Sequence, residues 1–210
     1  GNLIHVGEIS YVNYIVPGVL LQCIGQCSST TAIMMNRDVT SGMVSRFCTL
    51  PIKNISILNG HILEAFMRNL LTSGIVLLVA VLLGFRPSIN LMDWGIVFVL
   101  LTGIILALSW LAIIVGIMAN SAEGASALSA LAIVLPYLSS GFVPTETLPK
   151  VMRVFADYQP MTPIIDTMRN ALLGHSLEMD GCIIAFFWCV GLVVVFYFLS
   201  LVLFKNRMNK

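Results

Sequence analysis

Long apolar stretches alternate with short polar segments along this chain. Each of five stretches is long enough to cross a bilayer, for which a helix needs about 20 residues. The stretches are Tyr11 to Met35, Asn69 to Phe85, Trp94 to Ala122, Gly124 to Thr145 and Gly181 to Phe204. This pattern predicts an all-α, polytopic integral membrane protein with five transmembrane helices present.

Composition strengthens the membrane assignment. Hydrophobic residues make up 58% of the chain and charged residues only 10%, where a soluble domain carries about 25% charged residues. The mean hydropathy is +0.96. The net charge is +1, with eleven scattered Lys and Arg residues, whereas a nucleic-acid-binding surface needs a clustered basic excess. The expected surrounding is therefore a lipid bilayer, and no nucleic-acid partner is expected.

The five cysteines do not form the framework of a disulfide-rich protein. Cys23, Cys27 and Cys189 fall well inside apolar stretches, and Cys48 and Cys182 lie near the ends of stretches. Cys23 and Cys27 lie one helical turn apart, but their stretch contains no His or carboxylate that could complete a metal site. We therefore expect no metal site, and interpret these cysteines as small apolar side chains.

Basic residues indicate the orientation of the chain, because short cytoplasmic loops are enriched in Lys and Arg. The tail KNRMNK, residues 205–210, follows the last stretch, so we expect a multi-pass protein of the cell membrane with its C-terminus in the cytoplasm. Counting back through five spans puts the loop 36–60 inside and Gly1 outside. Residues 1–10 do not resemble a signal peptide. We therefore expect a further helix to precede this sequence, giving six spans in the intact protein.

The first inner loop, NRDVTSGMVSRFCTLP, predicts an amphipathic helix from Asn36 to Leu50 at the membrane surface, stopped by Pro51. Apolar residues recur at helical spacing: Val39, Met43, Phe47 and Leu50. Polar residues occupy the other faces: Arg37, Asp38, Ser41, Ser45 and Arg46. Such a helix could simply anchor the loop, or it could dock a cytoplasmic partner.

Glu64 and Arg68 lie four residues apart, in the order that favours an ion pair on a helix. Ionisable groups near a span are candidates for a role in transport. However, we expect both side chains to sit in the first turns of the helix that begins near His61 and leads into the second stretch, where they can reach the membrane interface by snorkelling. A possible ion pair with either a structural or a transport role is therefore predicted.

The segment before the last stretch is polar and rich in proline. It predicts two short amphipathic helices, the first over Leu148 to Phe155. In the second, Thr162 can cap, Pro163 lies in the first turn and Gly174 ends the helix. Its apolar face contains Ile164, Ile165, Met168 and Leu172. Because these pieces are too short to span a bilayer, we expect them to re-enter the membrane or to lie flat at its outer surface.

Several motifs together resemble one family of transporters. They are SGMVSRFCTLPI in the inner loop, VLLGFRP at the end of the second stretch, and LSSGFVPTETLP followed by QPMTPIIDTMRNALLG before the last stretch. With these motifs the chain resembles the membrane domain of type-2 ABC exporters, in the daunorubicin-resistance permease branch. The resemblance covers essentially all 210 residues.

The resemblance implies a permease that pairs with a separate ABC ATPase subunit and with a second copy of itself. ATP and Mg would bind to the partner subunit, and a hydrophobic or amphipathic drug, antibiotic or lipid-like compound would move outward. Residues 1–210 would form the transmembrane domain without the family's N-terminal interfacial helix and first transmembrane helix.

The resemblance also implies roles for two groups of residues. The helix from Asn36 to Leu50 would be the coupling helix seated in the ATPase, and the re-entrant helices would close an outer gate. The implied coupling residues are Arg37, Asp38, Met43, Arg46 and Phe47. The implied outer-gate residues are Pro144, Pro160, Pro163 and Arg169.

Other functions find less support in the residues. The chain contains no GxxxxGK[ST] loop, so it is not expected to bind ATP in the P-loop manner, and no cofactor is expected on it. An intramembrane serine enzyme at Ser126 would need a base within hydrogen-bond reach, yet none of the three histidines lies in an apolar stretch. We therefore predict no enzymatic activity. A passive channel or a membrane assembly scaffold is the alternative function.

Overall fold

The structure is a computed structural model that describes residues 11–48, 55–87, 90–127, 159–177 and 179–208. Every regular element in these ranges is a helix, which confirms the all-α fold class. The helices are α1 (Tyr11–Thr40), α2 (Met43–Cys48), α3 (Ile55–Leu82), α4 (Leu91–Met118), α7 (Met161–Leu173) and α8 (Met179–Met208). A further helical segment begins at residues 122–127.

Three of the described helices are long and apolar enough to cross a membrane: Ile55–Leu82, Leu91–Met118 and Met179–Arg207. The first predicted stretch forms α1, a helix of 30 residues. Polar residues are frequent in α1, which includes Gln22, Gln26 and the run Ser28 to Thr31, so its hydropathy is lower than that of the other long helices. Most of the fourth predicted stretch, Gly124 to Thr145, lies outside the described residues.

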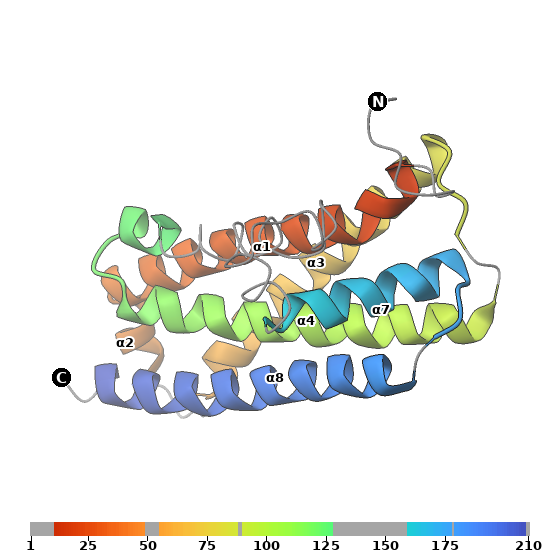
Figure 1. Ribbon diagram of the computed structural model, residues 1–210. Coiled ribbons are helices and arrows are strands. Elements are labelled where there is room, and N and C mark those ends of the chain that lie inside the picture. The colour runs from red at the N-terminus through yellow and green to blue at the C-terminus, as the bar shows by residue number, and fades with distance from the viewer. Residues whose placement is uncertain (1–10, 49–54, 88–89, 128–158, 178, 209–210) are drawn as a thin grey trace, which may run out of the picture.

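The long helices lie side by side, with α4 in the centre, where it contacts α1, α3, α7 and α8 (Figure 1). One end of the bundle holds α2 and the C-terminal ends of α1, α4 and α8. We call it the basal end. The N-terminal ends of α1, α4 and α8 lie at the opposite end. Helix α7 runs beside the half of α4 that is distant from α2.

Helix α3 begins earlier than the predicted second stretch, at Ile55 instead of Asn69. The prediction is wrong here because it follows hydropathy, and the first half of α3 carries polar residues that contact α1. Asn69 itself is fully buried. Glu64 and Arg68 therefore lie about two and a half turns or more into the helix, and not in its first turns.

The predicted single helix from Asn36 to Leu50 is also wrong. Helix α1 continues to Thr40, and a turn at Ser41 and Gly42 separates it from α2, which has only six residues. Gly42 has φ +74°, a left-handed conformation that glycine adopts readily and that commonly ends helices. The amide of Ser41 donates to the carbonyl of Arg37 at 2.8 Å, which closes the last turn of α1.

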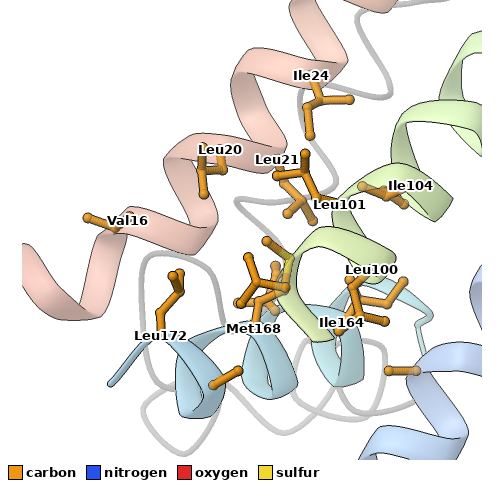
Figure 2. Close-up of a cluster of buried hydrophobic side chains, with 14 of the residues drawn as sticks. Val16, Leu20, Leu21, Ile24, Leu100, Leu101, Ile104, Ile164, Met168 and Leu172 are labelled. Carbon is orange, nitrogen blue, oxygen red and sulfur yellow. The ribbon is translucent and has the colours of Figure 1, made fainter. Parts of the chain in front are cut away.

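The two larger apolar clusters hold most of the bundle together. The central cluster joins α1, α4 and α7, and Figure 2 shows Leu20 and Leu21 of α1 facing Leu101 of α4, with Met168 of α7 beside them. The basal cluster joins α1, α2, α4 and α8 with the beginning of α3. Its buried members are Met35, Val44, Leu58, Trp110, Ile113, Ile117 and Phe204. Helix α4 contributes to both clusters and so connects the two ends.

Candidate functional site

The turn between α1 and α2 carries the residues that the sequence implies for coupling. Arg37 and Arg46 are exposed, and Met43 is 46% exposed. Asp38 contacts the start of α3, where its carboxylate Oδ2 lies 3.1 Å from Nε2 of His61. The backbone of Phe47 belongs to α2, but its side chain lies outside the described part of the chain. The turn thus presents two arginines and a methionine at the basal end.

Helix α2 is attached to the bundle through its opposite side. Val44 is only 1% exposed and belongs to the basal cluster. There it joins Met35 of α1 and Leu58 of α3, together with residues of α4 and α8. Helix α2 is therefore packed into a core to which α1, α3, α4 and α8 all contribute.

Asn36 is a residue that the sequence reasoning did not single out. It lies beside the implied coupling residues but is buried, with 1% of its surface exposed. Its side-chain amide Nδ2 donates to the carbonyls of Gly116 at 3.0 Å and Ala119 at 2.6 Å, at the end of α4. Its position in the sequence could have indicated this role, because a lone side-chain amide at the end of an apolar stretch is a candidate for a contact between helices.

Glu64 and Arg68 are brought together, with Oε1 of Glu64 2.6 Å from Nη1 of Arg68. Arg68 also reaches across to α1, where Nη2 donates to Oγ1 of Thr31 at 2.6 Å and to the carbonyl of Cys27 at 3.1 Å. The Sγ atom of Cys27 lies 3.7 Å from Oγ1 of Thr72 in α3. The ion pair thus belongs to a polar contact between two neighbouring helices.

A cavity of about 550 Å³ lies between the basal halves of α1 and α3. Its wall combines the Asp38 and His61 pair with Glu64, and apolar surface from Met34 and Ile57. Arg37 also lines this cavity, so the wall carries basic and acidic side chains together.

Helix α7 has the apolar face that the sequence predicts. Ile164, Ile165, Met168 and Leu172 are all buried. Gly174 ends the helix with φ +68°, as expected for a left-handed cap. The prediction that Thr162 caps the helix is wrong: α7 begins at Met161, after Pro160, and no side chain caps it. Pro160 occupies the cap position, and its side chain has no oxygen that could accept a hydrogen bond from the first turn.

Arg169 anchors α7 to the first turns of α1. Its guanidinium lies 3.9 Å from the ring centre of Tyr14, and Nε donates to the Tyr14 carbonyl at 3.2 Å. Its Nη1 lies 2.7 Å from Oδ1 of Asp166. Pro160 and Pro163 frame the start of α7, whereas Pro144 lies outside the described residues. Among the implied gate residues, Arg169 thus links α7 to α1.

Known proteins are similar to this chain over most of its length. Residues 3–173 match the family model described as ABC-2 type transporter. The daunorubicin resistance ABC transporter permease protein DrrB1 of Streptomyces coeruleorubidus is 29% identical over 202 residues, which cover 94% of this chain and 70% of the relative. The probable doxorubicin resistance ABC transporter permease protein DrrC of Mycobacterium tuberculosis is 30% identical over 201 residues, or 93% of this chain and 71% of the relative.

The family match and the apolar helices agree. The matched residues include α1 to α4 and all of α7, and three of the described helices can cross a membrane. Both relatives are permease subunits by name, which points to a non-enzymatic, multi-pass membrane component. The chain belongs to the ABC-2 type transporter family.

Proposed function

We propose that this chain is the membrane-spanning permease subunit of an exporter that is driven by ATP hydrolysis in a separate subunit. The observation that carries this proposal is membership of the ABC-2 family, combined with a sequence that contains no P-loop of its own. Family membership favours this function over a passive channel or an assembly scaffold. Hydrophobic or amphipathic compounds, such as the anthracyclines in the relatives' names, are the expected cargo.

The ATPase subunit would dock on the turn between α1 and α2. This turn exposes Arg37, Met43 and Arg46, a combination of charge and flexible apolar surface that suits a partner protein. Val44 on the same short helix is buried in the basal cluster. Movement of the ATPase could therefore act on the spanning helices through α2.

The basal end would face the cytoplasm. Lys205 and Arg207 lie in the last turn of α8, at the same end as Arg37 and Arg46. Four basic residues at one end of the bundle follow the positive-inside rule. This orientation puts the docking turn on the side where ATP is available.

Helix α7 would form part of the outer gate. It has 13 residues, which at 1.5 Å per residue gives about 20 Å and is too short to span the membrane. It packs beside the outer half of α4 in this orientation (Figure 1). We propose that it re-enters from outside, held by Arg169, and that a second copy of the permease completes the exit path.

The Glu64 and Arg68 pair would have a structural role in this scheme. Its hydrogen bonds all end on α1 or within α3, so it holds two helices together. A role in binding cargo would require the pair to separate, which would leave the Arg68 guanidinium without its charged partner inside the membrane.

The test uses the full-length gene product produced together with its ATPase. The double variant Arg37→Glu and Arg46→Glu reverses the charge of the docking turn. We expect it to reduce the amount of co-purified ATPase by about tenfold, equivalent to about 1.4 kcal/mol of binding free energy, and to reduce export in membrane vesicles. Arg86→Glu is the matched control, because Arg86 is also exposed but follows α3 at the other end. Normal ATPase binding and export in the double variant would contradict the proposal.

A further inference from the structure

Asn36 joins the end of α1 to the end of α4 by two hydrogen bonds from one amide group. Both acceptors, the carbonyls of Gly116 and Ala119, belong to the last turn of α4 and its cap. The last carbonyls of a helix have no partner within that helix. Asn36 therefore provides from α1 the donors that the end of α4 needs, and these bonds are shielded from solvent because Asn36 is buried.

The backbones of α1 and α4 approach closely at this point. A Cβ atom added at Gly116 would lie 2.6 Å from the carbonyl oxygen of Ala32 and 2.8 Å from Cβ of Met35. No side chain other than that of glycine fits there without moving a helix. Close approach and hydrogen bonding thus coincide in what we call the α1–α4 joint, formed by Ala32, Met35, Asn36 and Gly116.

The joint lies between the docking turn and the centre of the bundle. Asn36 directly precedes Arg37, and Met35 packs in the basal cluster with Val44 of α2. From the joint, α4 extends to the central cluster, where Leu100, Leu101 and Ile104 pack with Ile164 and Met168 of α7 (Figure 2). A continuous packed path therefore leads from α2 through α4 to α7.

We propose that Asn36 is a positioning residue for energy coupling: it locks α4 to α1, so that α4 and the α7 helix packed on it follow α1 when the ATPase moves α2. This inference rests on the proposed function. It assigns a role to a buried residue that touches neither the ATPase nor the cargo. Without the joint, ATP hydrolysis would still move α2 and α1, but α4 would no longer move together with α1.

The main variants are Asn36→Leu and Asn36→Asp. Leucine has a similar size but no donor, and aspartate keeps the shape while placing a carboxylate against two carbonyl oxygens. Ser28→Ala is the matched control. Ser28 is also buried in α1, and its hydroxyl donates to the Ile24 carbonyl at 2.8 Å within the same helix. The control thus removes a buried hydrogen bond but leaves both hydrogen bonds between α1 and α4 in place.

Coupling is measured as daunorubicin exported per ATP hydrolysed, in vesicles containing the full-length permease and its ATPase. We expect Asn36→Leu and Asn36→Asp to hydrolyse ATP at near the wild-type rate but to export at least about tenfold less per ATP. A purely structural defect would lower the yield of the complex and both rates together. Wild-type export per ATP in both Asn36 variants would overturn the proposal.

A distance measurement decides the question even if the Asn36 variants fold poorly or the wild type does not export daunorubicin. Met34 of α1 and Met118 of α4 are 41% and 60% exposed, and each accepts a spin label as cysteine in a cysteine-free background. We expect one label distance in the wild type, both without nucleotide and with the ATPase trapped by vanadate. Labels at Ser41, which is exposed in the turn that leads into α2, and at Met118 report whether this turn moves relative to α4.

The label distances and the binding of the ATPase test the role of Asn36 and the proposed exporter function separately. A Met34–Met118 distance that changes on trapping in the wild type would overturn the inference alone, because α1 and α4 would not be locked. Failure of the wild type to bind any ATPase would overturn the proposed function, and the inference with it. An unchanged distance in the wild type that becomes two distances in Asn36→Leu would support both.

Discussion

Helices α4 and α8 are equally hydrophobic, yet they occupy opposite environments. The most apolar 18 residues of each have a mean hydropathy of 2.7, but 61% of that stretch is buried in α4 and only 11% in α8. Helix α4 packs against four neighbouring helices, whereas α8 packs mainly against α4 and α7 and leaves most of its residues exposed. Hydropathy therefore identifies both as membrane helices but does not distinguish the centre from the periphery.

The difference in burial between α4 and α8 follows from the positions of their small residues. In a membrane, apolar surface gains little by leaving lipid for protein, so close packing at small residues drives helix association. Gly103 of α4 approaches α8 so closely that an added Cβ would lie 2.9 Å from Cβ of Cys189, and Gly116 approaches α1 in the same way. The exposed side of α8 carries large residues instead, such as Phe187, Val195 and Phe198.

The largest expected difference between the two helices comes from removing side-chain volume. Ile104 of α4 is fully buried, whereas Ile184 of α8 is 49% exposed. We expect Ile104→Ala to lower the free energy of unfolding by about 2–4 kcal/mol, because it leaves a cavity. Ile184→Ala, which leaves no cavity, should be nearly neutral. Unfolding in mixed detergent micelles measures both, and equal losses would contradict the central position of α4.

A slightly smaller effect is expected from adding volume at the α1–α4 joint. We expect Gly116→Ala to destabilise the protein by about 1–3 kcal/mol, because the nearest neighbour is backbone and cannot rotate away. Gly95→Ala on the same helix is the control, since an added Cβ at Gly95 meets nothing within 4 Å. Denaturation midpoints of the two variants give the comparison. A Gly116→Ala protein as stable as Gly95→Ala would show that the helices are further apart than the structure has them.

A moderate effect is expected from the polar contact between α1 and α3, which α8 does not share. Arg68→Met removes the ion pair and both hydrogen bonds to α1. We expect a loss of about 1–2 kcal/mol, since hydrogen bonds between membrane helices are individually weak. Thr31→Val removes only one of these bonds and should cost less. If Arg68→Met exported normally, the pair would have no transport role, as proposed.

The smallest effect is expected at the anchor of α7. Arg169→Lys keeps the positive charge but cannot hold both the Tyr14 carbonyl and Asp166 with the same planar geometry. We expect a loss of about 0.5–1 kcal/mol, together with increased accessibility of a cysteine placed at the start of α7. Labelling kinetics with a membrane-impermeant thiol reagent measure this opening, and unchanged labelling would contradict the anchoring role of Arg169.

The elements that the sequence predicts well are those determined by local pattern. The apolar face of α7 and its end at Gly174 follow from residue spacing and from the conformational freedom of glycine. The i, i+4 spacing of Glu64 and Arg68 likewise predicts the contact that the structure contains. These features depend on residues within a few positions of each other.

The features that the sequence reasoning missed depend on contacts between distant segments. Helix α3 starts well before its hydropathy rises because its polar first half faces α1. Gly42 divides the predicted coupling helix, although the apolar spacing continues across it. Asn36 is 80 residues from its acceptor Gly116, so no local pattern could reveal the joint. The central position of α4 is missed for the same reason.

The most direct test is gentle purification of the full-length gene product from native membranes, with quantitative mass spectrometry of the proteins that accompany it. We expect a protein with a P-loop motif in stoichiometric amount with the wild-type permease, and its loss from the Arg37→Glu and Arg46→Glu variant but not from Arg86→Glu. A wild-type permease that carries no ATPase, under conditions that preserve other membrane complexes, would contradict an ATP-driven exporter and would favour a channel or scaffold.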